Sequence, residues 1–282
     1  LMAQGASLTA MGGHPFRLAE EVWFRFGYAK GPVEALNGQR FFTIDSAAEL
    51  EQKWPQILSQ HPDFIKTILW VSDEREQRKN NQKYRGEYGL DPRLLPSIVA
   101  KAHAAKLRVS THINDARDFH LALAAGVDEI SHLPLSGLTP IAVEDAKMAA
   151  KRGIPVITTC AIVPTLPFLS KTELPQVLKV QSENLKLLYE TGVRLAIGSD
   201  NANDTSLKEF EYLQKLGVFD NLTLLKMWTE TTAQTIFPHR KIGALNEGYE
   251  ASFLALEGNP LKELRQVQRI KLRFKQGVLL EN

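Results

Sequence analysis

Along most of this chain, hydrophobic residues follow two patterns, one typical of strands and the other typical of helices. From about residue 62 onward, short apolar runs rich in β-branched residues are each followed by a longer segment with helical spacing. Strands are predicted at residues 64–70, 107–113, 127–132, 155–160 and 193–200. Helices are predicted at residues 46–59, 92–102, 116–125, 141–152 and 175–190. This order is typical of an α/β protein with a parallel sheet and crossover helices.

Local signals set the ends of several of these helices. Ser46 and Glu49 form the pattern of a capping box at the first helix start. Asp91 followed by Pro92 is typical of an N-cap and first helical turn. Gly126 follows the end of the predicted helix 116–125, where a left-handed cap is expected.

The pattern changes near the C-terminus. Two more helices are predicted at 206–216 and 222–236, and β-rich runs follow at 251–257 and 270–280 around the turn Gly258-Asn259-Pro260. So few strands do not fold alone. We therefore expect them to pair with other structure.

Composition narrows the class of protein. The chain is 44% hydrophobic and 23% charged, which is average for a globular protein, and its net charge is +2. Without a basic stripe, nucleic acid is not expected as a partner, and no apolar run reaches the roughly 20 residues of a membrane span. Cys160 is the single cysteine, so a metal would be bound by histidines and carboxylates.

Four polar residues coincide with the predicted strands. His112 and His132 end two successive strands, 20 residues apart, which is about one strand-helix repeat; Asp200 ends the last strand, and Lys66 lies within an apolar one. In a parallel α/β barrel the carboxyl ends of the strands form the active face. These side chains are therefore expected at a common centre.

Imidazole and carboxylate groups at one centre suit Zn²⁺, Mn²⁺ or Fe²⁺, and such a metal lowers the pKa of a bound water to about 7. Asp200 would then accept the proton of the attacking water. Singly, each residue has an ordinary alternative: Lys66 could extend its charge to solvent and Asp200 could cap a helix. The combination is what indicates a metal site.

At this point the chain resembles the amidohydrolase superfamily, in its imidazolonepropionase-like and Xaa-Pro dipeptidase (prolidase)-like branch. Residues 109–114, 122–132 and 196–200 resemble that branch's fifth, sixth and eighth strands. The four residues that end at Lys66 are similar to its fourth strand, whose lysine is carboxylated and bridges two metals. Met11-Gly12-Gly13-His14 resembles its Gly-Gly-His loop.

The resemblance implies a TIM-like (β/α)8 barrel over residues 1–241, with the first strands missing from this chain. Residues 242–282 are similar to the C-terminal part of the family's small β-sandwich. The implied metal ligands are Lys66, His112, His132 and Asp200, with Asp200 also catalytic, His14 touching substrate, and one or two divalent ions, Zn²⁺ first among them. The implied activity is hydrolysis of a C–N amide bond in a dipeptide, an N-acyl amino acid or a cyclic amide.

Two departures leave alternatives open. The family's first strand carries a His-x-His pair, and no two histidines here stand two apart. The chain is then a fragment, is completed by another chain, or is a non-catalytic binding or scaffold homologue. Ser252 replaces the usual aspartate after Ala251, which concerns the sandwich. A metal-free lyase or isomerase with Lys66 as a Schiff base fits the surrounding residues less well. The sequence leaves the substrate, metal, compartment and any homo-oligomer undecided.

Overall fold

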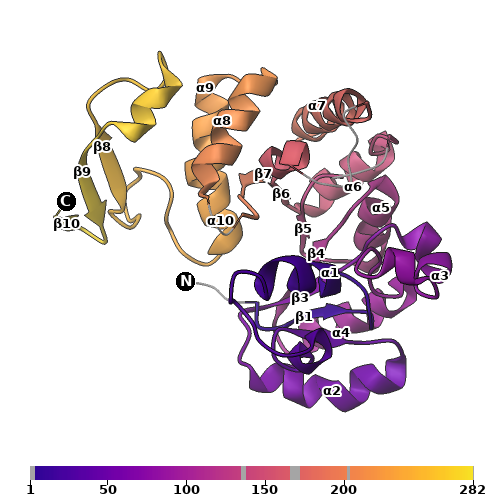
Figure 1. The fold of residues 1–282 in the computed structure, drawn as a ribbon. Coiled ribbons are helices and arrows are strands. Elements are labelled where there is room, and N and C mark those ends of the chain that lie inside the picture. The colour runs from indigo at the N-terminus through magenta and orange to yellow at the C-terminus, as the bar shows by residue number, and fades with distance from the viewer. Residues whose placement is uncertain (1–3, 135–137, 166–171, 202–203, 282) are drawn as a thin grey trace.

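A parallel sheet forms the centre of the protein. The computed structural model describes residues 4–134, 138–165, 172–201 and 204–281. Seven strands are hydrogen-bonded in the order β2-β1-β3-β4-β5-β6-β7, every pair parallel (Figure 1). Their bounds are β1 Ser7–Thr9, β2 Phe41–Thr43, β3 Phe64–Ile68, β4 Arg108–His112, β5 Glu129–Ser131, β6 Val156–Thr158 and β7 Leu195–Ile197.

Helices follow the strands in the alternation that the sequence predicts. The longer ones are α2 Ala47–Ser59, α4 Leu95–Ala104, α5 Ala116–Ala125, α6 Val143–Arg152, α7 Leu174–Glu190 and α8 Ser206–Leu216. After α8 come α9 Asn221–Lys226, a π-helical turn Met227–Thr231 and α10 Thr232–Ile236, where one helix was predicted. Short helical segments are α1 Phe16–Leu18, the π-helix Ala19–Trp23, α3 Arg75–Arg78 and the 3-10 segments Val33–Leu36, Ser72–Glu74, Gln82–Tyr84, Pro92–Leu94, Cys160–Thr165 and Leu264–Gln268.

The predicted N-caps and the glycine C-cap are confirmed, although the Glu49 carboxylate accepts from the N–H of Asp45 and not from that of Ser46. The Ser46 hydroxyl accepts a hydrogen bond from the backbone N–H of Glu49, and the Asp91 carboxylate accepts one from the N–H of Arg93. Gly126 adopts the left-handed conformation at φ 83° after α5. These caps determine where the helices begin and end.

The N-terminal part of the sheet differs from the expectation. Strands β1 and β2 were not predicted, because each has only three residues and all are buried, which leaves no alternation to detect. β1 lies between β3 and β2, so β2 is one edge of the described sheet and β7 is the other.

A second, three-stranded antiparallel sheet lies beyond α10, at the left of Figure 1. It contains β8 Phe253–Leu256, β9 Ile270–Lys275 and β10 Val278–Leu280. The predicted strand 270–280 is in fact a hairpin, since Gln276 and Gly277 both have positive φ, as tight hairpin turns require.

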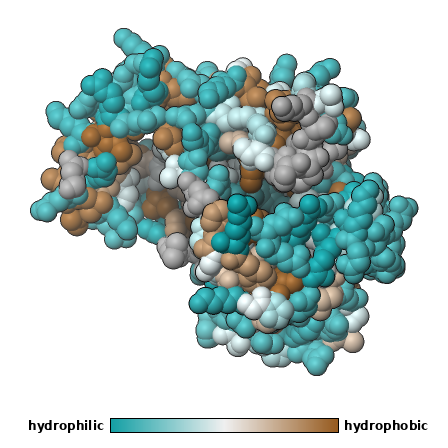
Figure 2. All heavy atoms as spheres, viewed as in Figure 1, coloured by the Kyte–Doolittle hydropathy of each residue, from teal (hydrophilic) through white to brown (hydrophobic). Residues whose placement is uncertain are grey.

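The hydrophobic core lies between the parallel sheet and its helices, and the small sheet adds little to it. Figure 2 shows a largely hydrophilic face with hydrophobic side chains gathered over the small sheet. On the two faces of the small sheet, Leu254, Val278 and Leu279 expose 52%, 62% and 52% of their surface. Among the described helices, none has the length and apolar character of a membrane span.

Candidate active site

The register of β3, β4 and β5 brings the predicted residues to one end of the sheet. Ile68 pairs with His112, and His112 pairs with Ser131, so His132 follows one residue beyond the same level. Lys66 pairs with Ser110, two residues further back along the same strands. The polar residues therefore come from neighbouring strands at their carboxyl ends.

Lys66 points toward β5. Its Nζ lies 2.5 Å from Ser131 Oγ, which is 2.8 Å from Ser110 Oγ. Burial lowers the pKa of Lys66 to about 8, although Glu129 and Asp200 favour the charged form. A lysine in this state is neutral more often than an exposed one, which is the form needed for reaction at nitrogen.

His112 and His132 are in contact and buried, with 6% and 5% of their surface exposed. Their rings meet edge to face, with centroids 4.4 Å apart. Burial is the main cause that lowers the pKa of both imidazoles, so both are neutral near pH 7. His132 Nδ1 lies 2.7 Å from Thr159 Oγ1, and its backbone has a left-handed φ of 75°.

Asp200 reaches the same group from the end of β7. Its Oδ2 lies 3.9 Å from His132 Nδ1. The residue has a left-handed φ of 49°, which turns the chain sharply after the strand. Half of the side chain is exposed, yet burial by the surrounding protein raises its pKa, while Lys66 and His14 act to lower it.

His14 lies over the strand ends in a stack of rings. Its centroid is 4.7 Å from that of Trp70 and 5.2 Å from that of His112. Trp70 and His112 are almost parallel, with an interplanar angle of 8°. Burial lowers the pKa of His14 to about 4, so the ring is neutral near pH 7.

Trp70 is a site residue that sequence reasoning missed. It ended a predicted strand as one more apolar residue, and nothing in its neighbours distinguishes it from a core tryptophan. The usable signal was its place, because Trp70 follows β3 at the same end of the sheet as His112.

The other histidines lie away from this group. His103 Nε2 is 2.8 Å from Asp128 Oδ2, and His120 Nδ1 is 2.8 Å from Asp145 Oδ1. His61 and His239 are exposed.

The fit to a metal can be tested on His112. Its Nε2 is buried and makes no hydrogen bond within the described structure, and a buried nitrogen of this kind calls for a partner. A metal ion would supply one. However, in the part of the chain that the structure describes, no three His, Cys, Asp or Glu side chains are close enough to hold an ion.

The Amidohydrolase family model matches residues 74–280. The chain belongs to this family. His112, His132 and Asp200 lie within the matched range, while His14 and Lys66 precede it.

Known proteins of similar sequence include ochratoxinase of Aspergillus niger, which is 26% identical over 193 residues. This match covers 64% of the chain and 39% of that protein, so the chain spans about two fifths of the curated relative's length.

Solved structures share the fold over nearly the whole chain. The A. niger ochratoxinase structure has a TM-score of 0.74 at 20% identity and covers 99% of this chain and 65% of its own. A prolidase complexed with N-methylphosphonate-L-proline has a TM-score of 0.71 at 19% identity, covering 99% of this chain and 68% of its own. A Xaa-Pro dipeptidase with methionine in its active site has a TM-score of 0.69 at 21% identity, covering 98% and 66%. The parallel sheet is thus part of an amidohydrolase TIM barrel.

Proposed function

We propose that the intact protein is a metal-dependent amidohydrolase that cleaves a C–N amide bond in a dipeptide, an N-acyl amino acid or a cyclic amide. The observation that carries the proposal is the contact of His112, His132 and Asp200 at the carboxyl ends of their strands, with a buried, unpartnered nitrogen on His112. That end of a TIM barrel is where active sites form.

His112, His132 and Asp200 would hold the metal, with carboxylated Lys66 as a bridge, and further ligands would come from residues outside this chain. When bound, the ion would activate water as a hydroxide nucleophile and polarise the amide carbonyl. Zn²⁺ is the expected ion, since two neutral imidazoles and a carboxylate suit it.

Other steps would depend on side chains of this chain, which orient a ligand, move a proton and contact the substrate. The Thr159 hydroxyl orients the His132 ring through Nδ1. Asp200, with half of its side chain exposed, can accept the proton of the attacking water and pass it to the leaving nitrogen. His14, a neutral ring over the strand ends, would contact the substrate.

Similarity to ochratoxinase, prolidase and Xaa-Pro dipeptidase structures supports small amide or peptide substrates. The loops that set specificity vary independently of the barrel, so the three substrate classes stay open. We also propose that residues 1–241 form the barrel and that residues 242–282 form the C-terminal part of the small β-sandwich.

The test is metal content and hydrolysis by the purified intact protein, with Xaa-Pro dipeptides, N-acyl amino acids and cyclic amides as substrates. His112→Gln should lower the hydrolysis rate at least about 1000-fold and reduce the metal bound, because the buried ligand is lost. His120→Gln, at a half-buried histidine paired with Asp145, is the matched control.

Other outcomes identify the alternatives. An intact protein that binds no metal and hydrolyses none of these substrates would be a binding or scaffold protein on the same fold. Trapping of a carbonyl substrate on Lys66 by borohydride would instead indicate Schiff-base chemistry.

A further inference from the structure

The loop that carries His14 is short, and its two glycines allow its backbone more conformations than other residues would. Gly12 has a left-handed φ of 72°, a conformation in which most side chains are strained. Yet the His14 ring lies in a defined stack with Trp70 and His112. The loop has a bond of its own from the Gly13 N–H to the Ala10 carbonyl, and contacts from other segments add to it.

Tyr88 contacts this loop at several points. Its hydroxyl donates to the carbonyl of Met11 at 2.6 Å, and its own carbonyl accepts from the backbone N–H of His14 at 2.7 Å. Two residues before it, the N–H of Gly86 donates to the carbonyl of Gly12 at 2.7 Å. The segment after β3 therefore holds both ends of the Gly-Gly-His motif.

The two glycines make this approach possible. A Cβ on Gly12 would lie 2.6 Å from the Tyr88 hydroxyl oxygen, and one on Gly13 would lie 2.7 Å from the Tyr88 carbonyl oxygen. Both distances are too short for two non-bonded atoms. The glycines of the motif thus serve the contact with Tyr88.

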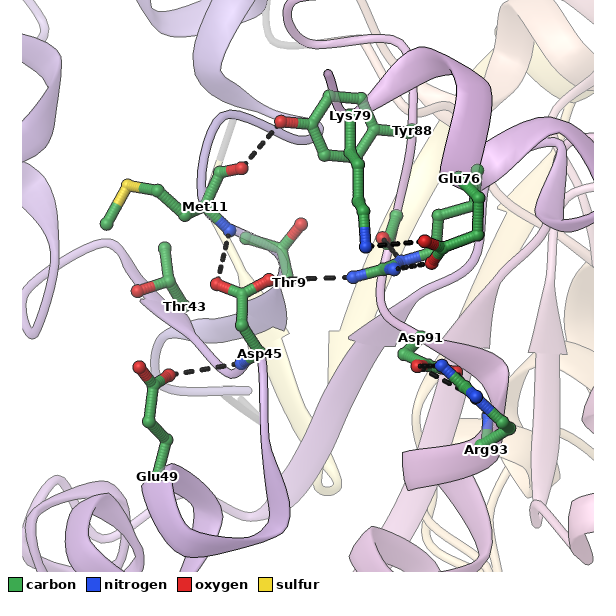
Figure 3. A network of polar contacts seen from close by, with 12 residues as sticks. Thr9, Met11, Thr43, Asp45, Glu49, Glu76, Lys79, Tyr88, Asp91 and Arg93 are labelled. Carbon is green, nitrogen blue, oxygen red and sulfur yellow. Dashed lines mark hydrogen bonds and ion pairs between the residues drawn. The ribbon is translucent and has the colours of Figure 1, made fainter.

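Asp45, which follows β2, holds the loop from another side, and Figure 3 shows Tyr88 and Asp45 both reaching Met11. Its Oδ2 accepts from the Met11 N–H at 3.0 Å. Arg75, only 4% exposed, joins the two supports: its Nη2 lies 3.5 Å from Asp45 Oδ1, and its Nε donates to the Gly89 carbonyl at 3.1 Å. The two supports of the loop are therefore connected through Arg75, which is buried, as is Tyr88.

We propose that Tyr88 is a positioning residue that sets where the His14 ring lies above the strand ends, with Asp45 as the second support of the same loop. This inference rests on the proposed contact of His14 with substrate. Loss of the Tyr88 hydroxyl frees the Met11 carbonyl and allows the two-glycine segment to move, which displaces a ring whose alignment affects the rate.

The first experiment reads the ring directly. The intact protein is labelled at histidine nitrogens, and the His14 resonance is identified by its loss in His14→Gln. Tyr88→Phe and Asp45→Asn should each shift or broaden that resonance. Tyr84→Phe, in the same segment but with its ring against Arg78, should leave it unchanged. An unchanged His14 resonance in both Tyr88→Phe and Asp45→Asn would overturn the proposal, and using two variants guards against one that does not fold.

The second experiment is a double-mutant cycle on hydrolysis. Tyr88→Phe should lower kcat/KM about tenfold in the wild-type background and less than about twofold in the His14→Gln background. Equal losses in both backgrounds would mean that Tyr88 acts independently of His14, against the proposal. If the wild type hydrolyses no amide, the proposed function fails, while the His14 resonance still decides whether Tyr88 positions the ring.

Discussion

The orientation of the His132 ring depends on one hydroxyl. Thr159 Oγ1, 2.7 Å from Nδ1, would determine which ring nitrogen faces the proposed metal. Such a partner behind a metal ligand typically changes metal affinity by about 10- to 100-fold. Side chains that do not touch substrate, such as Thr159, are therefore also part of the proposed site.

We predict that Thr159→Val weakens metal binding by about tenfold, measured by competition with a chelator of known affinity. Thr67→Val is the control, since Thr67 shares a buried hydrogen bond of 2.7 Å with Thr111. Both variants lose a buried hydrogen bond and should lose similar stability. Equal metal affinity in the two variants would contradict the role given to Thr159.

At the scale of elements, Asp118 on α5 joins the ends of two strands. Its carboxylate accepts from the N–H groups of Val71 and Ser72 after β3 and of Asn114 after β4, and from the Ser72 hydroxyl. It is fully buried. This one side chain therefore holds the strand that carries Lys66 beside the strand that carries His112.

Asp118→Asn should lower the free energy of unfolding by about 2 kcal/mol, because an amide nitrogen replaces one acceptor oxygen opposite backbone donors. The measurement is urea unfolding of the intact protein followed by circular dichroism. Asp73→Asn, at an exposed residue paired with Arg117, should change stability little. Similar values for the two variants would show that the Asp118 contacts contribute little.

Asp115, the N-cap of α5, gives the fold a pH dependence. Burial, and then the neighbouring Asp118, raises the pKa of Asp115 to about 6 from an ordinary 3.8. The folded state therefore binds this proton more tightly than the unfolded state does, and stability falls as pH rises from about 4 to about 6.

Asp115→Asn should remove this loss, since asparagine is an equally good N-cap for the Asp118 N–H. We expect the variant to be about 1 kcal/mol more stable than the wild type at pH 7, a gain reduced by the partial exposure of the side chain. Unfolding measured from pH 4 to pH 7 checks it. A difference between variant and wild type that does not change over this range would exclude Asp115 as the titrating group.

Elements with a clear hydrophobic period could be predicted from the sequence, and elements without one could not. The five strands from β3 to β7 carry apolar runs between segments with helical spacing. β1 and β2 give no periodic signal over three residues. The turn at Gln276 and Gly277 was missed because only Gly277 has the residue type that such a turn favours.

The same limit applies to the site. His112, His132 and Asp200 could be inferred from their places at strand ends, and the structure brings them together. The stack of His14 on Trp70 depends on a contact between distant segments, which no local pattern records. The sequence therefore predicted the site residues at the ends of strands, but it did not predict how the loops pack over them.

At the scale of the whole molecule, the small sheet presents an apolar face. Phe253 and Phe274 stack with centroids 4.7 Å apart, and Leu279 pairs with Phe274 in the next strand. Paired residues share a face, so the three side chains form one row, and Leu272 adds to it. A three-stranded sheet gains stability when it packs such a face against other structure. We expect further strands to pack on this face.

Leu279→Ser should therefore act differently in two contexts. In the intact protein it should lower the free energy of unfolding by about 1 to 2 kcal/mol, the value of burying the exposed half of a leucine and its contacts. In a protein made only of residues 1–282 it should leave stability almost unchanged and reduce self-association, measured by sedimentation, because the exposed row is interrupted. Leu254→Ser is the control: Leu254 is equally exposed at 52% but, as the neighbour of Phe253, points to the opposite face. If both variants were neutral in the intact protein, the row would be open to solvent there, and the small sheet would be stabilised by its contacts with the helical layer rather than by strands packed on its face.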